Sequence, residues 1–346
     1  MKLKRKLIEE EIVVLVTSKA ILEASLQAYK KGQPFAIGAY NVNNMEQMQG
    51  IMMAAQEKKA PIIAQVSRGA LKYAQDKYLI NIIKSAAELA PEVPVAIHLD
   101  HGNSFETVKR AIDLGCTSVM IDGSLMEDSK TPSTFEYNVK VTSEVVKYAH
   151  DRGVTVEGEL GTLGGIEDGV GSGQTHLTDP DEAVEFVERT GVDALAISIG
   201  TSHGAFKFKG EAKLAYDIIE KIRKLLPDTY LVSHGSSSVP AELVDQINKY
   251  GGKLEHAQGV PLEALKKAIA YGINKINVDT DIRLAATAAV RQFLVEHPEK
   301  FDPREYLKVS REAIANEIKK RMDAFGTGGH ITDVPNWGLE EMKARY

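Results

Sequence analysis

A short stretch that combines two histidines with an aspartate is the first place in this sequence where chemistry can be expected. It reads His-Leu-Asp-His-Gly over residues 98–102 and follows the apolar run 95–97. β-Branched and small apolar residues ahead of a glycine are typical of a strand that ends in a turn. Charged groups buried at a strand end need a partner, so the stretch indicates a bound metal ion or a group that transfers a proton.

Strand geometry constrains how this stretch can work. Neighbouring side chains of an extended strand point to opposite faces, so Asp100 and His101 can serve one pocket only if the strand has already curled into its loop at Gly102. A lone histidine at a strand end is also often a hydrogen-bonded surface residue without a ligand. Histidines elsewhere in the chain must therefore decide between the two interpretations.

Two more histidine–glycine pairs follow apolar runs later in the chain. His203 and His234, like His101, lie one to four residues beyond a run with strand character. Three imidazoles that converge and leave one coordination position open form a Lewis-acid zinc site, which polarises a carbonyl or activates water. We expect His98 to be a core residue or a support for these ligands. The other histidines are expected to face solvent: His150, His176, His256, His297 and His330.

Strand-like and helical segments alternate regularly along the chain. Eight βα units favour a single (β/α)8 TIM barrel, an α/β fold that carries its working groups at the carboxyl ends of the strands. A doubly wound open sheet is the alternative, but it usually has a glycine-rich turn after its first strand, and residues 43–46 contain no glycine. The expected strands are 35–42, 62–67, 95–100, 118–122, 155–160, 194–199, 230–233 and 275–279. The helices expected between and after them are 47–58, 71–90, 105–114, 135–152, 181–190, 212–225, 241–250 and 262–271.

Additional helices are expected at both ends of the barrel repeat. The apolar spacing predicts helix 18–30 before the first strand, and helices 282–296 and 305–325 after the last. The last two are long and amphipathic, which suits either subunit contacts or ordinary core packing. With an exposed leader of residues 1–12 and a tail of residues 326–346, we expect one domain over residues 1–346.

Composition limits the possible functions. Lys plus Arg number 42 against 48 Asp plus Glu, a formal net charge of −6 over 346 residues, which argues against broad nucleic-acid binding. The basic start, 1–6, is followed by glutamates 9–11 and a short apolar run, which is too short for a signal sequence or a membrane span. The single Cys116 cannot form an internal disulfide, so a reducing cytoplasm is expected.

Acidic and polar side chains end several of the other expected strands. Because the parallel strands of a barrel open at one mouth, these groups would meet the imidazoles there. They are Asp122, Glu157, Glu159, Asn277 and Asp279.

The loops after the last two strands are rich in small and hydroxyl residues. Barrels commonly bind phosphate at this place, and such residues let backbone N–H groups approach phosphate oxygens. The two loops are residues 235–238 and 277–280, and Pro240 opens the next helix. Taken alone, such a run is as readily a plain turn. The glycine-rich loop 161–173 suits either a lid that carries an acid onto the substrate or a mobile surface loop.

Six motifs together resemble those of class II, metal-dependent fructose-1,6-bisphosphate aldolases. The resemblance covers about residues 16–325, and the motifs are highly specific as a set. They are AIHLDHG at 96–102, VEGELG at 156–161, GGIEDG at 164–169, GTSHG at 200–204, SHGSS at 233–237 and INVDT at 276–280.

This resemblance implies reversible aldol cleavage of fructose 1,6-bisphosphate to dihydroxyacetone phosphate and glyceraldehyde 3-phosphate. His101, His203 and His234 would bind a catalytic Zn²⁺ that polarises the ketone and stabilises its enediolate. Asp122 and Glu159 would hold a second or alternative position for a divalent or monovalent cation.

The resemblance also implies two proton carriers and a substrate-binding set. Glu167 would remove the carbon-bound proton of dihydroxyacetone phosphate. Asp100 would protonate the aldehyde oxygen of the other triose, or deprotonate the C4 hydroxyl during cleavage. Phosphate and hydroxyl groups would be held by Asn41, Ser67, Gly204, Gly235, Ser236, Ser237, Asn277, Val278, Asp279 and Thr280.

Two departures from the family pattern affect these roles. Ser236 and Ser238 stand where relatives often have glycine, which leaves the phosphate geometry of that loop open. Ile166 stands where some relatives carry a second glutamate, so Glu167 is the candidate of that pair.

Three rival activities remain to be weighed. Tagatose-1,6-bisphosphate aldolase shares the chemistry and differs at one carbinol centre, so it remains the alternative. A class I aldolase needs a Schiff-base lysine at a strand end inside the barrel. Lys275 is expected to begin the last strand, at the wrong face, and Lys207 is expected in a loop beyond His203. A barrel metallohydrolase often has a His-x-His pair on its first strand, and residues 35–40 contain no histidine.

The expected partners are sugar bisphosphate and triose phosphate substrates and a second copy of the chain, in a homodimer or homotetramer. No nucleic-acid or membrane partner is expected.

Overall fold

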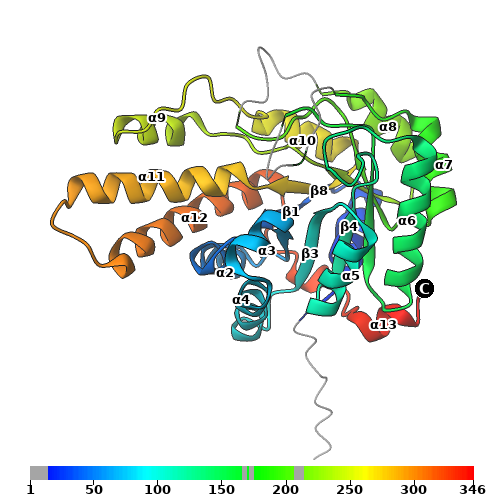
Figure 1. The fold of residues 1–346 in the computed structure, drawn as a ribbon, viewed down its shortest axis with the longest axis horizontal. Helices are drawn as coiled ribbons and strands as arrows, with labels where there is room; N and C mark the ends of the chain where they lie inside the picture. The colour runs from blue at the N-terminus through cyan, green and yellow to red at the C-terminus, as the bar shows by residue number, and fades with distance from the viewer. Residues whose placement is uncertain (1–14, 166–169, 171–174, 206–213) are drawn as a thin grey trace, which may run out of the picture.

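Eight parallel strands close into a barrel in which each strand pairs with the next along the chain and β8 pairs with β1 (Figure 1). The predicted (β/α)8 fold is thereby confirmed. The computed structural model describes residues 15–165, 170, 175–205 and 214–346, so the predicted leader 1–12 lies outside the described residues. The strands are β1 Ile37–Asn41, β2 Ile62–Ser67, β3 Val95–Gly102, β4 Ser118–Ile121, β5 Thr155–Leu160, β6 Ala194–Ile197, β7 Tyr230–Ser233 and β8 Ile273–Val278.

Helices surround the barrel (Figure 1), and several of them start at a residue whose side chain caps the helix. The side chains of Ser104, Thr134 and Asp179 each accept a backbone N–H of the first helical turn that would otherwise lack a partner. Gly115 and Gly191 end two of these helices in the left-handed conformation. The helices are α2 Met45–Lys58, α3 Arg68–Ala74, α4 Asp76–Leu89, α5 Phe105–Leu114, α6 Phe135–His150, α7 Pro180–Thr190, α8 Tyr216–Leu225, α9 Ala241–Lys249 and α10 Leu262–Tyr271.

Helix α1, Ser18–Lys30, covers the amino end of the barrel. Its buried Ile21 and Leu22 belong to a cluster with Ala39, Ala96 and Ala196 from the strands. The small strand side chains leave room for the larger helix residues. The end of the barrel opposite the predicted site is therefore filled with apolar side chains.

Two long helices, α11 Thr280–Glu296 and α12 Pro303–Phe325, form a hairpin that projects from the barrel (Figure 1). Around its turn, Leu294, Val295 and Phe301 are exposed, Phe301 by 89%. The chain then forms the 3₁₀ helix η1 Ile331–Asp333 and helix α13 Leu339–Lys343. None of the described helices is long and apolar enough to cross a membrane.

Two local predictions were wrong. The expected helix 71–90 is two helices, because Gln75 adopts a φ of +63° and breaks the backbone between α3 and α4. His150 does not simply face solvent: its Nε2 lies 2.9 Å from Asp193 Oδ2, and its ring stacks on Tyr346.

Candidate active site

A bulge in β3 brings Asp100 and His101 into one pocket. The pairing of β3 with β4 shifts register between Leu99 and Gly102, and His101 adopts a φ of +47°. This left-handed conformation is costly for a residue with a Cβ, and residues that adopt it cluster at functional sites. The curl therefore occurs at His101, one residue earlier than predicted. Gly102 serves another purpose, because a Cβ there would lie 2.5 Å from the carbonyl oxygen of Met120 on β4.

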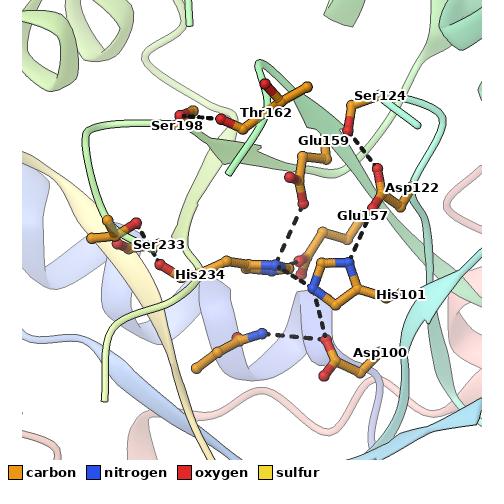
Figure 2. A network of polar contacts seen from close by, with 12 residues as sticks. Asp100, His101, Asp122, Ser124, Glu157, Glu159, Thr162, Ser198, Ser233 and His234 are labelled. Carbon is orange, nitrogen blue, oxygen red and sulfur yellow. Dashed lines mark hydrogen bonds and ion pairs between the residues drawn. The ribbon is translucent and has the colours of Figure 1, made fainter. Parts of the chain in front are cut away.

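The rings of the three predicted metal ligands lie together at the carboxyl mouth of the barrel. The ring centroid of His101 is 4.7 Å from that of His234 and 5.1 Å from that of His203. His101 Nε2 and His234 Nδ1 face each other at 3.0 Å (Figure 2). Within the described residues, two trios place potential ligand atoms within 4.8 Å of one another: Asp100, His101 and His234, and His101, Asp122 and Glu159. His203 adjoins these trios but is in neither.

Hydrogen bonds on the outer sides of the rings determine which nitrogens face the centre. His101 Nδ1 lies 3.2 Å from Asp122 Oδ2, and His234 Nε2 lies 2.8 Å from Glu157 Oε1. A carboxylate accepts hydrogen bonds, so we assign a proton to each of these outer nitrogens. In the neutral rings, two lone pairs then face each other across 3.0 Å, an arrangement that needs a cation or a proton between them.

A buried carboxylate oxygen completes the fit to a metal ion. Glu159 Oε2 lies 3.5 Å from His234 Nδ1 and has no hydrogen-bond partner among the described residues. A buried acceptor without a donor is costly. Imidazole nitrogens and a carboxylate oxygen are a donor set that suits Zn²⁺. The residues present therefore fit a divalent cation.

Burial and neighbouring charges shift the pKa values at this centre. Burial alone would lower the pKa of His101, but the carboxylates of Asp100, Asp122 and Glu159 together raise it to about 10. Burial and the charge of His101 hold the pKa of His234 well below its usual value. Burial and the neighbouring Asp122 raise the pKa of Glu159 well above its usual value. Without a metal, a proton on His101 therefore occupies the place where a cation would bind.

Asp100 is held by three side-chain amides. Asn41 Nδ2 and Gln65 Nε2 donate to Asp100 Oδ2 over 3.1 and 3.4 Å. Asn277 Nδ2 donates to Asp100 Oδ1 over 3.3 Å. Gln65, which is fully buried, was not predicted as a site residue, although a glutamine within the otherwise apolar strand run 62–67 was a signal that could have revealed it.

Most predicted substrate residues line one pocket beside the histidines. The lining includes Asn41, Ser67, Gly235, Ser236, Ser237, Asn277 and Asp279. Val278, by contrast, points into the apolar core between strands and helices, so only its backbone could face a ligand. Gly204 and Thr280 are not in this lining, and Thr280 is the first residue of α11.

Arg68 also lines this pocket and was missed by the sequence analysis. Its Nε donates to the carbonyl oxygen of the bulged His101 over 3.3 Å, and its Nη2 donates to Ser129 Oγ over 2.6 Å. The guanidinium thus supports the strained backbone from the pocket side.

The predicted phosphate loop after β7 is held by Asp281. The backbone N–H groups of Ser238 and Val239 donate to the carboxylate of Asp281 over 2.9 and 2.7 Å. Arg321, from α12, donates to the same carboxylate over 2.9 Å. These bonds fix a loop in which Val239 adopts a φ of +48°, a conformation that a β-branched residue rarely takes.

The prediction that Lys275 begins the last strand was wrong, because β8 begins at Ile273. The side chain of Lys275 is fully buried inside the barrel. Its Nζ donates to Glu157 Oε2 over 2.8 Å, below the histidines. Lys275 is not among the residues that line the substrate pocket.

One predicted catalytic residue cannot be placed. Glu167 lies outside the described residues, together with most of the predicted lid and with Lys207.

The sequence of this chain is similar to those of fructose-bisphosphate aldolases. The family model described as fructose-bisphosphate aldolase class-II matches residues 21–330. A fructose-bisphosphate aldolase of Giardia intestinalis is 54% identical over 316 residues, which cover 90% of this chain and 94% of that protein. A fructose-bisphosphate aldolase of Nostoc sp. is 50% identical over 328 residues, which cover 90% of this chain and 91% of that protein.

Solved structures are similar as well. The YdjI aldolase of Escherichia coli K12 has a TM-score of 0.72 at 28% identity, covering 92% of this chain and 99% of that one. A putative fructose-1,6-biphosphate aldolase of Coccidioides immitis has a TM-score of 0.73 at 28% identity, covering 91% of this chain and 99% of that one.

Proposed function

Because the chain belongs to the class II fructose-bisphosphate aldolase family, we propose that the side chains gathered at the carboxyl mouth of its barrel carry out a metal-dependent aldol cleavage. The enzyme is a carbon–carbon lyase that splits fructose 1,6-bisphosphate reversibly into dihydroxyacetone phosphate and glyceraldehyde 3-phosphate. The observation that carries the proposed site is the pair of imidazole nitrogens, His101 Nε2 and His234 Nδ1, that face each other at 3.0 Å beside the ring of His203.

His101, His203 and His234 would hold a divalent ion, which we propose is Zn²⁺, and Asp122 and Glu159 would offer a second cation position. A bound ion would supply Lewis-acid chemistry, which stabilises the negative charge that develops on the ketone oxygen of the substrate when the C3–C4 bond breaks.

The protein's own residues would move the protons. Asp100, held by Asn41, Gln65 and Asn277, takes the proton of the C4 hydroxyl during cleavage and returns it during synthesis. Glu167 exchanges the proton on the carbon of dihydroxyacetone phosphate.

The pocket wall would hold the phosphates and hydroxyls of the substrate. The loop after β7, with Gly235, Ser236 and Ser237, offers backbone N–H groups and hydroxyls. Asp279 is held in place by Arg283, whose Nε and Nη2 donate to it over 2.7 and 2.6 Å. Asn41, Ser67, Gly204, Asn277, Val278 and Thr280 complete the proposed set.

The substrate is fructose bisphosphate and not its tagatose epimer, as the names of the relatives indicate. Cleavage rates on the two bisphosphates, compared on the metal-loaded enzyme, would show a clear preference for fructose. Equal rates would contradict this assignment.

We also propose a homodimer or homotetramer located in the cytoplasm. The exposed apolar turn with Leu294, Val295 and Phe301 suits contact with a second copy. Size-exclusion chromatography with light scattering would show a mass above 37.8 kDa. Cell fractionation would test the compartment. A single buried free thiol, Cys116, fits the reducing cytoplasm.

A chelation experiment tests the function. EDTA should abolish cleavage of fructose 1,6-bisphosphate, and added Zn²⁺ should restore it, because charge on the ketone oxygen then has its stabilising cation again. Borohydride with substrate should trap no covalent adduct on Lys275 or any other lysine. Activity that survives complete removal of the metal would contradict the proposal.

A further inference from the structure

A column of buried polar side chains runs below the proposed metal centre. Ser118 Oγ lies 2.7 Å from His98 Nδ1, and His98 Nε2 lies 3.5 Å from Lys275 Nζ. Lys275 Nζ donates to Glu157 Oε2, and Glu157 Oε1 accepts from His234 Nε2, each over 2.8 Å. The core of the barrel is thus connected to one imidazole of the centre, as the Glu157–His234 contact in Figure 2 shows.

The ion pair in this column is buried. The side chains of Glu157 and Lys275 are 3% and 0% exposed. Taking two charges out of water costs several kcal/mol per ion, and an apolar pair of similar volume is often as stable. Stability alone therefore does not explain why a lysine and a glutamate lie here.

Glu157 and Glu159 on β5 differ in their hydrogen-bond partners. They are two residues apart on one strand, so both point to the inside of the barrel. Glu159 Oε2 faces the centre without a hydrogen-bond partner among the described residues. Glu157 has both oxygens engaged, one by His234 and one by Lys275. Glu157 is therefore placed to orient a ligand and not to be one.

We propose that Glu157 and Lys275 are positioning residues for the metal centre. Glu157 keeps the proton of His234 on Nε2 and so turns the lone pair of Nδ1 toward the cation. Lys275 fixes the second oxygen of Glu157 and thereby the plane of the carboxylate. The inference rests on the proposed metal site, whose ligands it orients.

The chain offers a closely matched control at the other end of the barrel. Asp193 is a buried carboxylate, 3% exposed, that also binds one lysine and one histidine, Lys19 Nζ over 2.8 Å and His150 Nε2 over 2.9 Å. Its further contacts are the Val156 amide and Tyr346. Asp193→Asn thus removes the same kind of buried charge without touching the imidazoles of the centre.

The test measures metal affinity instead of activity. Co²⁺ is titrated into metal-free wild type, E157Q, K275M and D193N in competition with a chelator of known affinity, and unfolding by urea is recorded for each. E157Q should bind Co²⁺ about 10–100-fold more weakly, the usual cost of losing an outer partner of a ligating histidine. K275M should also bind Co²⁺ more weakly than wild type, though less so than E157Q, because Glu157 loses the contact that fixes the plane of its carboxylate; loss of a positive charge alone would tighten binding. D193N should bind like wild type. All three variants should unfold at lower urea concentration.

Weaker binding in K275M separates positioning from the effect of charge alone, and unchanged binding in D193N separates it from a general loss of stability. Binding in K275M as tight as in wild type, or as much weakening in D193N as in E157Q, would overturn the inference while leaving the metal site intact. Wild type that binds no Co²⁺ would overturn the metal site and the inference together. If E157Q does not fold, the ¹⁵N NMR signals of His234 in the zinc-loaded wild type test the proposal instead. Protonated Nε2 with ligating Nδ1 is expected, and the reverse tautomer would overturn the proposal.

Discussion

Asp100 owes its proposed role to three amide donors and to its place beside the imidazoles. The amides of Asn41, Gln65 and Asn277 come from β1, β2 and β8, so three strands define where this carboxylate lies. His101 Nε2 lies 3.9 Å from Asp100 Oδ1. A carboxylate fixed this firmly can take a proton from one defined substrate hydroxyl.

Replacing Asp100 by asparagine should separate the two proton transfers. D100N keeps the shape of the side chain but cannot take the C4 proton, so cleavage should fall by about 10²–10⁴-fold. The exchange of the carbon-bound proton of dihydroxyacetone phosphate, followed by NMR in deuterium oxide, should persist. Glu167→Gln should lose both activities. Exchange lost in D100N together with cleavage, or normal exchange in the Glu167 variant, would exclude this division of roles.

Metal affinity should depend on pH because His101 titrates. Carboxylates overcome burial and raise the pKa of His101 to about 10, so the metal-free ring carries a proton at neutral pH. A metal needs the lone pair of Nε2 and must displace that proton. Affinity for Zn²⁺ should therefore increase about tenfold per pH unit between pH 6.5 and 8.5, with release of at least one proton. Calorimetry in buffers of different ionisation enthalpy measures that release, and an affinity independent of pH would contradict the assignment.

The residue types at the strand ends were enough to predict which side chains gather at the mouth. The orientation of two of them was not predictable. A curl at His101 instead of Gly102 depends on the register of β3 against β4, and the inward orientation of Lys275 depends on the pairing of β8 with β7, whose register shifts between Leu231 and Val232. Both depend on pairing between strands, which the local pattern does not contain.

One buried carboxylate connects several elements at the amino end of the barrel. Asp193, just before β6, binds Lys19 of α1, His150 of α6 and the backbone N–H of Val156 on β5. The hydroxyl of Tyr346 donates to the same carboxylate over 2.9 Å, and its ring stacks on His150 at 3.6 Å. The tail after α13 is thereby fastened to the barrel.

Removing the Tyr346 hydroxyl should lower stability without affecting catalysis. Tyr346→Phe keeps the ring stack and loses one hydrogen bond, so the free energy of unfolding should fall by about 0.5–1.5 kcal/mol. Urea unfolding measures the loss, and kcat/KM on fructose bisphosphate should stay at the wild-type value. A drop in kcat/KM would mean that the tail reaches the active site.

Helix and strand positions were largely predictable, because caps and periodicity are local. The break at Gln75 was not, since the residues around it include neither glycine nor proline. The structure shows the break as a φ of +63° at Gln75, between α3 and α4.

The side chains proposed to act on the substrate and the contacts that close the barrel lie at opposite ends of the molecule. Helix α1 and the Asp193 contacts close the amino end, while the imidazoles and acids open at the carboxyl end. The column from Ser118 through Lys275 to His234 connects the two. A rigid closed end thus supports side chains that must meet around one cation.

The location of the metal tests this account most directly. Crystals of the zinc-loaded enzyme, measured at the zinc absorption edge, should show an anomalous peak about 2.0–2.1 Å from His101 Nε2, His234 Nδ1 and a ring nitrogen of His203. A peak elsewhere, or an active enzyme in which those three rings bind no metal, would contradict the account.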